Sequence, residues 1–138
     1  MFINFNFSIQ TKGYCDIINI SDEVEKFINK SKIKNGNVLV FSPGSTCGIT
    51  SIEYEPGAIE DLKSAFDFIV PEKKQYQHNL RWGDGNGFSH IRAAITKSFF
   101  LFPIIDCKSI LGTWQQIVFI DFDNRPRRRD IIVQINGE

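Results

Sequence analysis

His78 and His90 are the only histidines of the chain, and Asp84 lies between them. Imidazoles titrate near neutral pH, so they serve as general bases or as metal ligands. Two imidazoles and a carboxylate could therefore transfer a proton. They could also bind a divalent ion, Zn²⁺ or Mg²⁺, with Glu53 as a further oxygen ligand. Their spacing is not a recognised zinc pattern, and ordinary packing of both histidines within a loop is the alternative.

A cluster of arginines between residues 125 and 129 follows the apolar segment 117–120. Guanidinium groups bind phosphate through two parallel hydrogen bonds. Alternate residues of a strand face the same side, so a strand that begins here places Arg127 and Arg129 on one face and Arg128 on the other. We predict that Arg127 and Arg129 bind phosphate. A solvated turn, or salt bridges across a subunit contact, are the alternatives.

Thr113, Trp114 and Gln115 precede the same apolar segment and combine a hydroxyl, a large ring and an amide. Trp114 could stack on a heteroaromatic ring or wall off a pocket, and Gln115 could hold a phosphate or a water. With the arginines at the other end, they predict an anion-binding site built on a β scaffold. The alternative is a core tryptophan with Gln115 facing a neighbouring subunit.

The segment 43–48 interrupts the apolar pattern with glycine and hydroxyl residues, among them Ser45 and Thr46. Backbone amides of such a loop can receive an anion, so both residues are candidates for substrate binding. The segment lacks the GxxxxGK[ST] form and is not a P-loop. A plain tight connection is the alternative, and Cys47 is expected to be a small buried residue rather than a nucleophile.

The hydrophobic periodicity shows which elements must position these groups. Phe5, Phe7 and Ile9 alternate with polar residues and predict a strand, with 14–20 as its hairpin partner. A helix is expected from Ser21 as N-cap, and a second from Pro56, where proline suits the first turn. The remaining expectations are strands at 38–41, 49–54, 98–105, 113–122 and 130–135, a long loop at 72–89 and a short helix at 90–96.

This order predicts an α+β fold, a mainly antiparallel β-sandwich with two to three helices in a single domain over 1–138. The 138 residues have no net charge, which argues against nucleic-acid binding. Three cysteines without CxxC spacing do not suggest a disulfide framework. The alternating N-terminus is not a signal peptide, and no apolar stretch approaches membrane-spanning length. We therefore expect a cytoplasmic protein with no membrane partner.

Several ordered motifs resemble the YjbQ-like family, a widespread uncharacterised family often given the name secondary thiamine-phosphate synthase. The matching segments are 44–50 with Glu53, 76–79, 84–93, 111–115 and 127–138. The resemblance implies an α+β sandwich that assembles as a homotrimer. Two departures stand out: many members have a His-Thr pair at Gly44-Ser45, and glycine with two small hydroxyl residues at Lys97-Ser98-Phe99. A role that depends on that missing histidine does not carry over, whereas His78, Asp84 and His90 do match.

These residues together predict a small enzyme that acts on a phosphorylated small molecule. His78 or His90 would transfer protons or hold a metal, and Asp84 would orient a histidine. The resemblance implies joining a pyrimidine diphosphate to a thiazole phosphate. Because this short chain has no DDxxD-type motif, we expect that reaction only as a weak side activity. The alternative is a non-enzymatic trimeric protein that binds a ligand or serves assembly.

Overall fold

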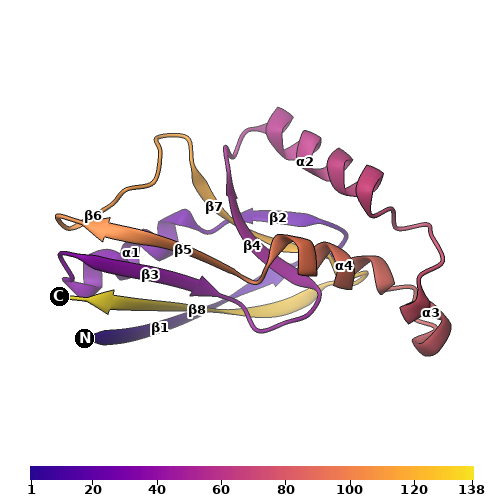
Figure 1. Ribbon diagram of the computed structural model, residues 1–138, viewed down its shortest axis with the longest axis horizontal. Helices are drawn as coiled ribbons and strands as arrows, with labels where there is room; N and C mark the ends of the chain where they lie inside the picture. Colours follow the sequence, from indigo (N-terminus) through magenta and orange to yellow (C-terminus); the bar gives the residue numbers. More distant parts are fainter.

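The computed structural model describes residues 1–138. Eight strands and four helices follow one another along the chain. Their bounds are β1 Phe2–Thr11, β2 Asp16–Asn19, α1 Ser21–Ser31, β3 Gly36–Phe41, β4 Cys47–Ile52, α2 Pro56–Ile69, α3 Gln77–Trp82, α4 Gly87–Thr96, β5 Phe99–Ile105, β6 Lys108–Ser109, β7 Gln116–Asp121 and β8 Arg127–Gly137 (Figure 1).

The strands form two sheets in which every neighbouring pair is antiparallel. The larger sheet has the order β1-β8-β3-β5-β6, and the smaller has the order β2-β7-β4. β8 pairs with β1 along its whole length, from Phe2 opposite Asn136 to Thr11 opposite Arg127. β7 is the central strand of the small sheet, so it pairs with β2 along one edge and with β4 along the other.

Two hydrophobic cores explain this arrangement. The first lies between the sheets and α1, where Val40 and Val133 of the large sheet pack with Phe119 of β7. The second lies on the other side of the small sheet, where Val118 and Ile120 of β7 pack with residues of α2 and α4. Alternate β7 residues thus enter different cores, which is why this strand is apolar from Ile117 to Ile120. The expected α+β sandwich with mainly antiparallel sheets is confirmed.

The predicted hairpin between β1 and residues 14–20 is wrong. Gly13, Tyr14 and Cys15 all have positive φ angles of 77°, 51° and 62°. These three residues turn the chain out of the large sheet, and the Tyr14 N–H donates to the carbonyl of Asp123. The following strand, β2, therefore pairs with β7 in the small sheet rather than with β1.

Ser21 is not the N-cap of α1, which begins at Ser21 itself after Ile20. Its hydroxyl instead accepts a hydrogen bond of 2.8 Å from the N–H of Ile117, so it joins the helix to β7. Pro56 does occupy the first turn of α2, as predicted, and the Glu55 carboxylate caps that helix by accepting from the N–H groups of Gly57 and Ala58.

The predicted loop 72–89 contains α3 and the first residues of α4, which raises the number of helices to four. The six residues of α3 include no buried side chain, so no apolar periodicity marks them. The predicted short helix at 90–96 lies within α4. No helix is both long and apolar enough to cross a membrane.

The outer face of the large sheet carries an apolar patch over β3, β5 and β8. Leu39 lies opposite Leu101, and Phe41 lies opposite Phe99 and Ile132. We call these five residues the outer apolar face. Leu101 is 56% exposed and Phe99 is 46% exposed. The continuous apolar run at 38–41 was consistent with a buried strand, but only Val38 and Val40 enter the core.

Candidate functional site

The connection between β3 and β4 faces α4 and the start of β5 across an open pocket of about 390 Å³. We call it the α4 pocket. Gly44 and Ser45 line one side of it, and His90, Lys97 and Ser98 line the other. No aspartate or glutamate is among its lining residues. The pocket therefore offers hydroxyl, imidazole and ammonium groups without a competing carboxylate.

The two histidines meet beside this pocket. The ring centroids of His78 in α3 and His90 in α4 lie 4.3 Å apart, with the planes tilted by 39°. The Nδ1 atom of His78 is 3.4 Å from the Oδ1 atom of Asp84. That nitrogen is buried and makes no hydrogen bond, so the contact is close without being aligned. The three residues predicted to act together are thus neighbours.

His90 is held in a neutral state by its surroundings. Burial lowers its pKa below 6.5 and nearby His78 lowers it further, while Asp84 and Asp123 oppose the shift. Helix α4, which carries His90, is held in place by Arg92, and Arg92 is fully buried. The Arg92 guanidinium donates to the carbonyl of Val70 at 2.9 Å. α4 is therefore anchored to the end of α2, and His90 has a defined position.

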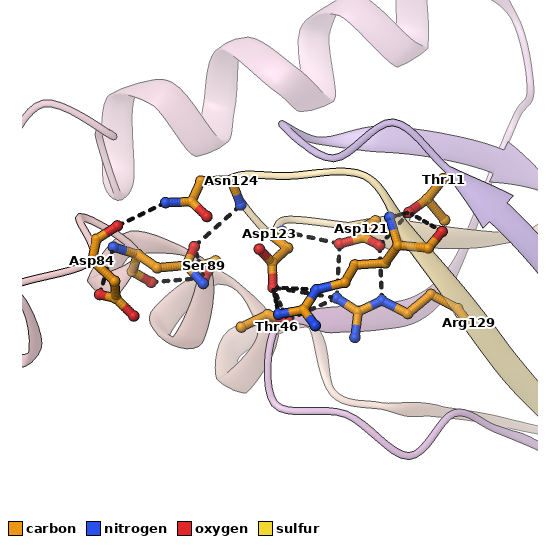
Figure 2. A network of polar contacts seen from close by, with 10 residues as sticks. Thr11, Thr46, Asp84, Ser89, Asp121, Asp123, Asn124 and Arg129 are labelled. Atoms are coloured by element: carbon orange, nitrogen blue, oxygen red, sulfur yellow. Dashed lines mark hydrogen bonds and ion pairs between the residues drawn. The ribbon is translucent and has the colours of Figure 1, made fainter. Parts of the chain in front are cut away.

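The arginines that were predicted to bind phosphate lie in a buried ionic network at the start of β8. Arg129 donates from Nε and Nη2 to the two carboxylate oxygens of Asp121, at 2.8 and 2.9 Å. Arg127 donates from Nη2 to Asp123 at 3.0 Å. Arg128 points to the other side, as the strand alternation predicted, and is exposed beside Asp130. The Nε and Nη2 atoms of both arginines thus already have carboxylate partners, and Figure 2 shows Arg129 bonded to Asp121.

Asp123 joins this network to the histidine side of the site. Burial raises its pKa, but the hydrogen bond from Thr46 and the charge of Arg127 outweigh burial, so the pKa is lowered below 3.8. Its Oδ2 atom accepts from Thr46 at 2.9 Å, whereas its Oδ1 atom is buried without a partner. Asp123 is therefore a buried carboxylate that stays charged, with one oxygen free.

Ser45 and Thr46 have different surroundings although they are adjacent. The Thr46 hydroxyl is buried, donates to Asp123 and accepts from Arg129 at 2.7 Å, so the network engages it. Ser45 is exposed and lines the α4 pocket. Cys47 is fully buried, and burial raises the pKa of its thiol. It is a packed core residue, as predicted, rather than an activated nucleophile.

Thr113, Trp114 and Gln115 lie away from the histidines. Trp114 lines a second pocket of about 420 Å³ together with Glu53 and Glu55. The Gln115 amide donates to the hydroxyl of Ser51 at 3.0 Å. This pocket is at the far end of β4, whose six residues span roughly 17 Å. Within one chain, one small ligand does not contact both groups of predicted residues.

Comparison with known proteins places the chain in a family. A model of the family described as UPF0047 protein YjbQ-like matches residues 5–138. The chain belongs to the YjbQ-like UPF0047 family. It is similar to a UPF0047 protein of Archaeoglobus fulgidus, with 34% identity over 127 residues that cover 92% of this chain and 96% of the relative. The UPF0047 protein YugU of Bacillus subtilis is 32% identical and covers 94% of this chain and 96% of its own length.

Solved structures of YjbQ-like proteins share the fold. A YbjQ-like protein of unknown function from Sulfolobus solfataricus superposes with a TM-score of 0.90 at 31% identity, over 100% of both chains. An uncharacterised protein of the same family from Clostridium acetobutylicum gives a TM-score of 0.87 at 32% identity, over 96% of this chain and 99% of that chain. The fold of this family member is therefore shared across archaea and bacteria.

The donor set of this YjbQ-like chain does not fit a metal ion. No group of three or more histidine, cysteine, aspartate or glutamate side chains is arranged to hold one. Glu53, predicted as a ligand with His78 and His90, lines the second pocket instead. Gly44 lines the α4 pocket without supplying a side chain that could bind a metal. We derive no catalytic step through a metal.

Three residues of the site were not among the predicted ones: Asp121, Asp123 and Lys97. Asp121 and Asp123 are the first acidic residues after the apolar run of β7, and both are fully buried. Charged residues at the end of a buried strand are seldom fully buried unless they are paired. The four arginines between residues 125 and 129 were the feature of the sequence that could have indicated ion pairs with Asp121 and Asp123. Lys97 had been noted only as a departure from the family pattern.

Proposed function

We propose that this YjbQ-like protein is a small cytosolic enzyme acting on a phosphorylated small molecule in the α4 pocket. The observation that carries the proposal is the pair of imidazoles, 4.3 Å apart, beside a pocket without carboxylates. A phosphorylated ligand brings negative charge and needs both donors and a proton-transfer group. The second pocket contains two glutamates and is a poorer place for a phosphate.

His90 is the group that we assign to proton transfer. The lowered pKa of His90 leaves its imidazole neutral at pH 7, so the imidazole can accept a proton from a bound hydroxyl or water. His78 is close enough to position the ring of His90, and the charge of Asp84 favours the protonated form of His90. Once His90 is protonated, it can return the proton to a leaving group, as a general acid.

Ser45 and Arg129 are the predicted binding residues that are closest to this pocket. The Ser45 hydroxyl lines it. The Nη1 atom of Arg129 makes none of the network's hydrogen bonds, and a side-chain carbon at Gly44 would lie only 3.2 Å from it. Figure 2 shows that this guanidinium has one nitrogen without a hydrogen bond. Ser45 and this nitrogen are our candidates for phosphate contacts, and Arg127 and Thr46 support them from the network.

A homotrimer is the assembly that the family resemblance implies, and the outer apolar face supports it. A contiguous apolar area on a sheet is a common sign of a contact with another protein. Phe99 belongs both to this face and to the α4 pocket, so a second copy on the face would lie beside the pocket. Assembly is also the route by which Thr113, Trp114 and Gln115 of one copy could approach the histidines of another.

Activity measurements on a panel of phosphorylated metabolites test the proposal. The panel includes phosphate monoesters and the pair of pyrimidine diphosphate and thiazole phosphate that a thiamine-phosphate synthase would join. We expect turnover by the wild-type protein and a decrease of about 100-fold or more in His90→Gln, the usual contribution of general acid–base catalysis. Arg128→Met, an exposed substitution outside the pocket, is the control and should keep full activity.

Two results would contradict the enzyme proposal. If His90→Gln and His78→Gln both keep wild-type turnover, proton transfer by these residues is wrong. If no substrate turns over but a phosphorylated compound raises the melting temperature of the wild-type protein, the protein is a ligand-binding module instead.

A further inference from the structure

Lys97 has a backbone conformation that normally belongs to glycine. It follows α4 and precedes β5, with φ 76° and ψ 155°. This region of the Ramachandran map is essentially restricted to glycine, because a side chain there meets its own backbone. The surrounding chain enforces the conformation from both sides. The Lys97 N–H donates to the carbonyl of Ala93 at 2.9 Å, and its carbonyl accepts from the N–H of Ile49 at 2.9 Å.

The strained residue is also the only lysine of the α4 pocket. Residues in such conformations persist when the surrounding structure fixes them, and they cluster at functional sites. Lys97 is exposed, so its positive charge is not buried in the core. A glycine here would relieve the strain. The chain instead keeps a residue whose distinctive property is a positive charge.

The opposite side of the pocket is open because Gly44 has no side chain. A Cβ atom at this position would lie 2.9 Å from the Sγ atom of Cys47 and 3.2 Å from the Nη1 atom of Arg129. Any larger residue would therefore push against a buried side chain and cover the free nitrogen of Arg129. Gly44 and Lys97 line the same pocket.

We infer that the α4 pocket binds an oxyanion of the size of phosphate, with Lys97 as the residue that supplies its charge. Lys97 and Ser45 line a pocket whose lining includes no carboxylate, and the free Nη1 atom of Arg129 lies next to Gly44 of the same lining. Charge-assisted hydrogen bonds of this kind are the strongest that a protein offers to phosphate. The inference uses the same pocket as the proposed function, but it requires binding only and not turnover.

Substitutions at Lys97 separate the charge from the strain. Lys97→Gly removes both, Lys97→Ala removes the charge and keeps an unfavourable conformation, and Lys97→Arg keeps the charge. Lys108→Ala is the matched control, because it removes an exposed lysine in β6, next to the far end of β5. The dissociation constant of inorganic phosphate is measured by isothermal titration calorimetry, and the melting temperature is measured without phosphate.

We expect phosphate to bind the wild-type protein, Lys97→Arg and Lys108→Ala with similar affinity. The glycine and alanine variants should bind about tenfold or more weakly, which corresponds to the loss of one charge-assisted hydrogen bond. Without phosphate, Lys97→Gly should melt about 4 °C or more above the wild-type protein, because the strain is gone. Lys97→Ala should not show this increase. Binding and stability then change in opposite directions at one residue.

The inference is overturned if the wild-type protein does not bind phosphate at millimolar concentration, or if Lys97→Gly and Lys97→Ala bind it as tightly as the wild type does. The strain argument is wrong if Lys97→Gly is no more stable than Lys97→Ala. The proposed function fails separately: phosphate binding that depends on Lys97 without turnover of any substrate supports this inference alone. Turnover with an unchanged KM in Lys97→Ala supports the enzyme and rejects Lys97 as its anion ligand.

Discussion

Replacing Arg129 with methionine tests whether the arginines of β8 serve the fold before they serve a ligand. The substitution removes three hydrogen bonds, two to Asp121 and one to Thr46. Asp121 is fully buried, and removing one partner of a buried ion pair usually costs about 3–5 kcal/mol. Two donors remain on Asp121, the Thr11 hydroxyl at 2.6 Å and the Asp123 N–H at 3.0 Å. They place the expected loss at the lower end of the range, about 3 kcal/mol.

The assay is urea unfolding followed by circular dichroism, with thermal melts in parallel. For a chain of this length, about 3 kcal/mol corresponds to a decrease of roughly 10 °C in the melting temperature. Arg128→Met is the neighbouring control, because Arg128 is exposed and its contact with Asp130 is 3.6 Å. Its effect should stay within about 0.5 kcal/mol. A loss below about 1 kcal/mol for Arg129→Met, or equal losses in the two variants, would refute the assignment of Arg129 to the buried network.

Two further predictions concern pH and assembly. The folded state holds the pKa of His90 below 6.5, so between that pKa and 6.5 the unfolded chain binds more protons than the folded one. The free energy of unfolding should therefore decrease as the pH falls below about 6.5. His90→Gln should make this decrease smaller, as measured by urea unfolding at pH 7.5 and 5.5. An equal decrease in the wild-type protein and the variant would contradict the prediction. Leu101→Glu places a charge in the outer apolar face and should convert the proposed trimer into monomers, as measured by light scattering. Gln10→Glu, on the polar part of the same sheet face, should leave the proposed trimer intact. A trimer that survives Leu101→Glu would show that this face is not the contact.

The fold could be predicted from the sequence wherever an element has one buried and one exposed face. Helix α2 illustrates this, because Pro56 marks its start and Phe66 is buried in the core while the opposite face of the helix is exposed. The hairpin prediction failed because periodicity says nothing about where the chain turns next. Positive φ angles at Tyr14 and Cys15 send β2 to the other sheet, and neither residue type signals such a conformation.

The site was predictable in its residue types but not in its grouping. His78 and His90 lie on successive helices, with Asp84 in the short connection between them, so their meeting was accessible to sequence reasoning. The separation of Trp114 from the histidines was not, because it follows from the direction of β4 and β7 in the small sheet. The pairing of Arg129 with Asp121 was equally hidden, since it joins the ends of strands that lie in different sheets.

Charge accounting decides which residues can attract an anion to this site. Arg127 and Arg129 contribute two positive charges, and the buried carboxylates of Asp121 and Asp123 contribute two negative charges. The network is therefore neutral as a whole, and its strongest donors point at carboxylates. A phosphate would gain little from it beyond the one unused nitrogen of Arg129. The uncompensated charge beside the pocket belongs to Lys97, which is why anion recognition in this chain should depend on a residue that the arginine-rich motif does not include.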